Sequence, residues 1–76
     1  MLSFEEYESL KFFRADIFNW KATGKFNGNG MDVIDVIRQK HGYRPMNYGC
    51  DGCKQEALTD AYNFIVEYEE NQQINR

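Results

Sequence analysis

DGCKQEALTDAYNFIVEYEE, residues 51–70, shows the clearest helical pattern in the chain, because its apolar side chains recur at spacings of three and four residues. Asp51 is an acceptable N-cap for this helix. Residues 71–76 have no apolar period, and we expect them to form a frayed tail. The sequence therefore predicts a helix over residues 51–70. Its expected inward face consists of Ala57, Leu58, Ala61, Phe64, Ile65 and Tyr68.

A second helix is predicted over residues 4–23. Ser3 and Glu6 have the spacing of a capping box, in which each side chain bonds to the backbone N–H of the other residue. Gly24 can adopt the left-handed conformation that ends a helix. The expected buried stripe consists of Leu10, Phe13, Ile17 and Trp20.

A third helix is predicted over residues 30–41, with Asn29 as its N-cap. Gly42 and Pro45 are stop signals at its end. Its expected buried side chains are Val33, Ile34, Val36 and Ile37. Together the three segments predict an all-α fold, a compact three-helix domain that comprises residues 1–76.

The composition limits the classes of function. Hydrophobic residues make up 42% of the 76 residues and aromatic residues 16%, which is enough apolar surface for a folded core. Twelve acidic and nine basic residues give a net charge of -3, which argues against a nucleic-acid binder. The first residues lack the pattern of a signal peptide, and no apolar run is long enough for a membrane span. We expect an intracellular protein.

The most distinctive motif is a C-x-x-C pair, Cys50 and Cys53, at the start of the helix over residues 51–70. The pair has three interpretations. With His41 it could form part of a zinc site, although a closed structural site needs four ligands. It could be a thiol redox couple, since a helix N-terminus stabilises a thiolate, although the chain has no strand pattern of the thioredoxin type. The third interpretation is two small packed thiols without chemistry.

Other chemical patterns in the chain are weaker. Ser9 has no histidine near it in sequence, and the glycine-rich loop over residues 24–30 lacks the ending of a phosphate-binding loop. We therefore expect no catalysis and no cofactor, with zinc as the alternative. A basic group around residues 38–54 is the basis for an alternative nucleic-acid patch, and it consists of Arg38, Lys40, Arg44 and Lys54.

The helix over residues 4–23 is more apolar around its circumference than a three-helix domain needs. Its surplus aromatic side chains predict a surface that binds another protein or a second copy of the chain. Acidic residues near the end of the helix over residues 51–70 suggest contact with a basic surface on that partner. The predicted partner-binding residues are Phe4, Tyr7, Phe12, Phe18, Glu67, Glu69 and Glu70.

Three segments also carry a resemblance: Asn19-Trp20-Lys21-Ala22-Thr23-Gly24-Lys25, His41-Gly42, and Cys50-Asp51-Gly52-Cys53. In their order and spacing, over about residues 10–65, they resemble small C-x-x-C-containing proteins of tailed bacteriophages of gut bacteria. The resemblance implies a phage accessory protein, either a minor virion component or a binder or inhibitor of a host protein. It implies a location in the virion or the host cytoplasm, and it assigns no site residues.

Overall fold

The structure is a computed structural model that describes residues 2–26, 28–47 and 49–74. The described residues contain four helices and no strand: α1 (Phe4–Lys11), α2 (Arg14–Thr23), α3 (Met31–Lys40) and α4 (Asp51–Ile74). The predicted all-α class is confirmed. The predicted number of three helices is wrong, because the segment over residues 4–23 forms two helices.

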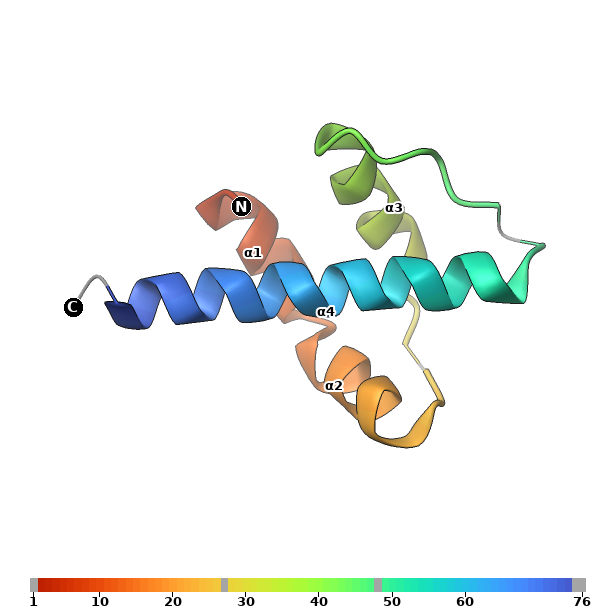
Figure 1. The fold of residues 1–76 in the computed structure, drawn as a ribbon, viewed down its shortest axis with the longest axis horizontal. Coiled ribbons are helices and arrows are strands. Elements are labelled where there is room, and N and C mark those ends of the chain that lie inside the picture. The colour runs from red at the N-terminus through yellow and green to blue at the C-terminus, as the bar shows by residue number, and fades with distance from the viewer. Residues whose placement is uncertain (1, 27, 48, 75–76) are drawn as a thin grey trace.

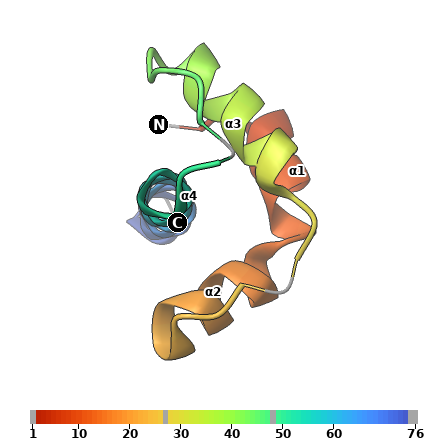
Figure 2. The same cartoon turned by 90° about the vertical axis from the view of Figure 1, so that its right-hand side faces the viewer.

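Helix α4 is the central element of the fold. It contacts each of the other three helices, and α1 also contacts α2 and α3. Figure 1 shows α4 as a long horizontal helix, with α3 on one side and α2 on the other. The view along α4 in Figure 2 shows α3, α1 and α2 arranged in an arc around it. This arc leaves part of α1 facing away from α4.

The break between α1 and α2 lies at Phe12 and Phe13. Phe13 has φ -109° and ψ 6°, outside the helical region, and its N–H donates to the carbonyl of Leu10 at 2.9 Å. A straight helix over residues 4–23 would extend about 30 Å in one direction. The break instead lets α1 pack against α3 while α2 packs along α4. Tertiary packing therefore overrides a continuous helical pattern in the sequence.

Phe13 also determines how α3 begins. A Cβ atom added to Gly30 would lie 2.6 Å from the Phe13 ring, so only glycine allows this close approach. Gly30 is the N-cap residue of α3, and it has no side chain with which to cap the helix. The predicted cap at Asn29 and the predicted range 30–41 are corrected to a Gly30 cap and a helix over Met31–Lys40.

Helix α4 continues beyond the predicted end at residue 70 and reaches Ile74. The predicted frayed tail over residues 71–76 is therefore helical as far as residue 74, and residues 75–76 lie outside the described residues. The Asn71 side chain donates to the carbonyl of Glu67 at 2.8 Å, a bond that is compatible with a helix. Because the helix continues, Glu67 does not lie in its last turn, and the dipole there opposes its charge less than the sequence suggested.

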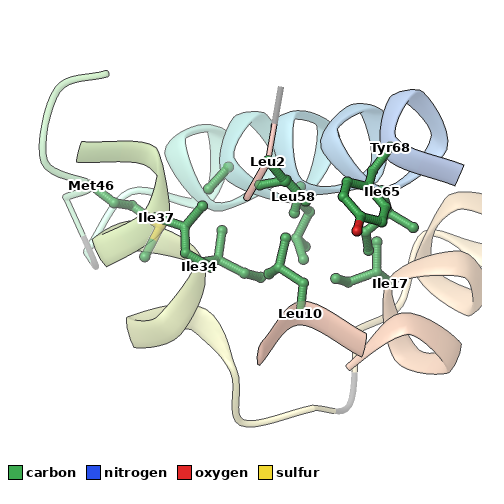
Figure 3. Packing of buried hydrophobic residues seen from close by; sticks show 11 residues of the cluster. Leu2, Leu10, Ile17, Ile34, Ile37, Met46, Leu58, Ile65 and Tyr68 are labelled. Carbon is green, nitrogen blue, oxygen red and sulfur yellow. The ribbon is translucent and has the colours of Figure 1, made fainter. Parts of the chain in front are cut away.

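The hydrophobic core contains side chains from all four helices (Figure 3). The predicted inward face of α4 is mostly correct, since Ala57, Ala61 and Ile65 are fully buried. Val36, which we predicted to be buried in α3, is instead 52% exposed. The buried hydrophobic cluster consists of Leu2, Leu10, Ile17, Ile34, Ile37, Met46, Ala57, Leu58, Ala61, Ile65 and Tyr68.

The predicted helix caps are confirmed at both ends of the 4–23 segment. Ser3 and Glu6 form the capping box, in which the Ser3 hydroxyl accepts from the Glu6 N–H at 3.1 Å and Glu6 Oε1 accepts from the Ser3 N–H at 2.9 Å. Gly24 ends α2 at φ 80°, in the left-handed region. These local signals placed the outer ends of the segment correctly, although not the break inside it.

Candidate functional site

One side of α1 carries an exposed apolar surface. Phe12 is 85% exposed and Phe4 is 64% exposed. Phe4 and Glu8 are four residues apart and Glu8 and Phe12 are also four apart, so the three follow one side of the helix. Lys11 lies within 3.9 Å of Glu8 across this side. We call Phe4, Glu8, Lys11 and Phe12 the α1 outer face.

A groove lies next to this face, between α1 and α3. Its volume is about 480 Å³, and exposed Val36 forms part of its apolar wall. Glu5 and Asp32 add negative charge to its lining, and Lys40 adds positive charge. The complete lining consists of Ser3, Glu5, Glu6, Ser9, Asp32, Val33, Val36, Ile37 and Lys40. The groove extends the exposed surface of α1 toward α3.

Two of the predicted partner-binding residues, Tyr7 and Glu69, make contacts within the fold. The Tyr7 ring stacks on Tyr68 with a centroid distance of 4.3 Å, and its hydroxyl donates to Glu69 Oε2 at 2.7 Å. Arg14 donates two hydrogen bonds to Glu69, from Nε at 2.7 Å and from the second guanidinium nitrogen at 2.9 Å. These contacts connect α1 and α2 to α4.

The charges at this site shift one another's pKa values. Hydrogen bonding from Arg14 lowers the pKa of Glu69 below its ordinary value. The pKa of Tyr7 is raised because its hydroxyl donates to the Glu69 carboxylate, and the pKa of Arg14 is raised by the same carboxylate. These shifts favour an ionised Glu69, a protonated Tyr7 and a protonated Arg14, and these are the forms whose hydrogen bonds join α1 and α2 to α4.

The remaining predicted partner-binding residues differ in exposure. Phe18 is half-buried, with its ring 5.0 Å from the Tyr62 ring and 4.2 Å from the Arg14 guanidinium carbon. Glu67 and Glu70 are exposed on α4. Of the four aromatic residues in the predicted set, Phe4 and Phe12 keep the greatest exposure.

The predicted zinc ligands are not brought together. His41 Nε2 lies 3.0 Å from Glu6 Oε1, and its ring lies 5.0 Å from the Phe64 ring. The pKa of Glu6 is lowered, first by the hydrogen bond from the Ser3 backbone and also by His41. Within the described ranges, no three His, Cys, Asp or Glu side chains are grouped so that they could hold a metal ion. A zinc site within one chain that uses His41 therefore has no structural basis in these residues.

The basic group around residues 38–54 does not form one exposed patch. Arg38 is 5% exposed, and its Nε donates to Asp60 Oδ2 at 2.9 Å. It also lies 3.9 Å from Asp35 Oδ1. Lys40 and Arg44 are exposed, and Lys54 is half-buried. Arg38 therefore joins α3 to α4 and is not available on the surface as part of a nucleic-acid patch.

Cys50 and Cys53 lie at the first turn of α4, where both are half-exposed. Cys50 immediately precedes the helix, and its Sγ accepts a hydrogen bond from the Cys53 N–H at 3.2 Å. The sulfur therefore occupies the acceptor position that a serine or aspartate side chain has at an ordinary N-cap. The expected cap at Asp51 is corrected, since Asp51 is the first helical residue.

The two thiols have pKa values shifted in opposite directions. The hydrogen bond from the Cys53 side chain lowers the pKa of Cys50, and the Cys53 backbone N–H lowers it further. The same side-chain hydrogen bond raises the pKa of Cys53, which donates it. The sequence spacing suggested that both cysteines were near the helix N-terminus, but it did not indicate which thiol would be the acceptor.

Comparisons with protein-family models, with curated proteins and with solved structures find no match to this chain. None of the helices in the described part of the chain has both the length and the apolar character needed to cross a membrane. The candidate sites are the α1 outer face with its groove and the cysteine pair, and both contain residues that the sequence predicted.

Proposed function

We propose that the chain is a non-catalytic protein-binding protein and that the α1 outer face contacts its partner. The observation that carries this proposal is the 85% exposure of Phe12 on a helix whose opposite side is already packed, with Leu10 fully buried. A large aromatic side chain that is exposed in the free protein gains most by inserting into a pocket on a partner. Phe4, on the same side of the helix, supplies a second anchor.

The charges around the α1 outer face indicate what the partner carries. The chain has a net charge of -3, and Glu5 and Asp32 line the adjacent groove. A partner segment with apolar side chains flanked by lysine or arginine would complement both features. Such charge pairs at the rim would mainly accelerate association, while burial of Phe12 would supply most of the affinity.

The resemblance to small proteins of tailed phages is the basis for the biological setting that we propose. In that setting the chain is a phage accessory protein, acting either as a minor component of the virion or as a binder or inhibitor of a host protein. It would act in the host cytoplasm or within the particle. In either role a single exposed aromatic face is sufficient for binding, and no catalytic group is required.

The test is a change of charge at the centre of the α1 outer face. Phe12→Glu should weaken binding to the purified partner by about 30-fold, the effect of losing one aromatic anchor. Gln55→Glu is the matched control, because it adds the same charge at an exposed position on α4. The control should bind like the parent protein, and thermal melts of both variants should match the parent.

Self-association is tested with the same variants. If the partner is a second copy of the chain, the mass in solution should fall with Phe12→Glu and remain unchanged with Gln55→Glu. If Phe12→Glu and Phe4→Glu each stay folded and still bind and assemble like the parent protein, the α1 outer face is not the binding surface.

A further inference from the structure

We propose that Cys50 and Cys53 are a redox-active dithiol, which a small-molecule disulfide oxidises reversibly to a disulfide within the chain. This activity goes beyond the proposed protein binding and uses a different part of the molecule. It rests on three features of the first turn of α4: the hydrogen bond from the Cys53 N–H to the Cys50 sulfur, the partial exposure of both thiols and the different surroundings of the two thiols.

The two sulfurs are neighbours because of the local fold. Cys50 Sγ accepts a hydrogen bond from the Cys53 N–H at 3.2 Å, which places the Cys50 sulfur against the backbone of Cys53. The backbone around Cys50 is also fixed, since its N–H donates to the Asn47 carbonyl at 3.1 Å and its carbonyl accepts from the Lys54 N–H at 3.2 Å. These bonds hold the two cysteines as neighbours at the start of α4, and a disulfide between them is the bond that we propose.

Access to the pair distinguishes it from packed thiols. Both side chains are partly exposed, and Cys53 also packs against the hydrophobic core, whereas Cys50 does not. A Cβ added to Gly52 would lie 4.0 Å from Cys50 Sγ, which means that any larger side chain at position 52 would extend close to this sulfur. Cys53 also lines a depression of about 460 Å³ that includes exposed Arg44. A small disulfide can therefore approach the pair, and Arg44 can attract carboxylates on it.

The pair has an asymmetry that assigns a role to each thiol. Cys50 has the lowered pKa, because it accepts the hydrogen bond from Cys53, so it is the thiol that more readily becomes the attacking thiolate. Cys53 has the raised pKa and remains protonated longer. Asp51 opposes the Cys50 thiolate by its negative charge. Cys50 is thus the nucleophile and Cys53 the resolving thiol.

The reaction consists of two thiol–disulfide exchanges. The Cys50 thiolate attacks one sulfur of the small disulfide, which forms a mixed disulfide and releases one small thiolate. Cys53 then loses its proton to solvent, and its thiolate attacks Cys50 Sγ, forming the Cys50–Cys53 bond and releasing the second small thiolate. The two cysteines are oxidised, the small disulfide is reduced to two thiols, and an excess of those thiols reverses both steps.

The experiment uses the full chain with oxidised glutathione as the probe, in buffers of varied ratio of oxidised to reduced glutathione. Samples are quenched in acid, alkylated and weighed by mass spectrometry. We expect a monomer with one internal disulfide that is lost again in excess reduced glutathione. Cys53→Ser should accumulate the mixed disulfide at Cys50. Cys50→Ser should react about tenfold more slowly than Cys53→Ser.

Two controls connect the rates to the structure. In denaturant the two single variants should react at similar rates, because unfolding removes the hydrogen bond from the backbone N–H of residue 53 to Cys50 Sγ. Asp51→Asn should increase the rate at Cys50 in the folded chain, because it removes the opposing charge. Thermal melts establish that each variant is folded before its rate is compared.

Several results would overturn the proposal. Equal rates for the two folded single variants, or faster reaction of Cys50→Ser, would remove the assigned roles. Disulfides that join two chains, with none inside one chain, would show that the sulfurs do not pair. Stoichiometric zinc that blocks both thiols and joins two copies would assign the cysteines to a shared metal site instead.

Discussion

Two arginine–carboxylate pairs connect α4 to other helices, and they differ mainly in burial. Arg38 and Asp60, 2.9 Å apart, join α3 to α4 with side chains that are 6% and 17% exposed. Arg14 and Glu69, 2.7 Å apart, join α2 to α4 with side chains that are 41% and 25% exposed. The first pair is shielded from water, whereas water competes for the second. Removing one residue from the buried pair should therefore cost much more stability than removing one residue from the exposed pair.

The largest expected effect is at the buried pair. Arg38→Met should lower the free energy of unfolding by about 3 kcal/mol, because it leaves the Asp60 and Asp35 carboxylates without their nearby cation in a buried site. Urea unfolding followed by circular dichroism measures this change. The double variant Arg38→Met with Asp60→Leu should recover part of the loss. Equal stability of the parent protein and Arg38→Met would contradict the distinction between the two pairs.

A smaller effect is expected at the exposed pair. Glu69→Gln should lower the free energy of unfolding by about 1 kcal/mol at neutral pH, because it removes the negative charge and replaces one of the two oxygens that accept from Arg14 with an amide NH2 group, in a partly hydrated site. The folded-state pKa of Glu69 is lowered, so its contribution is present above the unfolded pKa and is lost as the pH falls through the folded pKa.

The pH dependence gives this prediction a built-in control. At acid pH, below the lowered pKa, the parent carboxylate is protonated, and the parent protein and Glu69→Gln should unfold at nearly the same denaturant concentration. Melts of both proteins over a pH series measure the convergence. A difference that stays constant from neutral to acid pH would show that the carboxylate charge does not contribute.

The smallest effect is expected at a third pair, His41 and Glu6, which joins α3 to α1 with a distance of 3.0 Å. His41→Gln should lower the free energy of unfolding by about 0.5 kcal/mol, since a glutamine can retain a hydrogen bond to Glu6 and only the ring contact with Phe64 is lost. Urea unfolding at neutral pH measures it. If His41→Gln lowered the free energy of unfolding as much as Arg38→Met, burial of the Arg38–Asp60 pair would not explain the larger effect expected there.

Candidate residues could be identified from sequence where a local helical pattern was enough, but not where a contact joins distant segments. Phe12 was placed outside the buried stripes by its position in the helical pattern, and it is the most exposed large hydrophobic residue among those described. Tyr7 was assigned to partner binding from the surplus apolar face of its helix and Glu69 from the acidic end of another helix, although they are 62 residues apart and hydrogen-bonded to each other. No local pattern contains a contact at that separation, so the pairing could not have been predicted.

The spacing of the cysteines in the sequence was enough to find the pair, but it did not indicate what the pair does. C-x-x-C at the start of a predicted helix was compatible with packed thiols, the favoured interpretation, and with a metal site or a redox couple as alternatives. In three dimensions His41 is directed to Glu6, and both thiols are partly exposed although Cys53 also packs against the core. Sequence order could not show that Cys50, and not Asp51, supplies the cap of α4.

The sequence by itself determined the all-helical class, the outer ends of the 4–23 segment and most of the buried face of α4. These features depend on helical periodicity and on capping residues, which act within a few positions along the chain. Only the tertiary structure decided the break at Phe13, the pairing of Arg14 and Arg38 with their carboxylates, and the stacking of Tyr7 on Tyr68. These depend on contacts between distant residues, where close packing of Phe13 against Gly30 and burial of charge outweigh local helix preference.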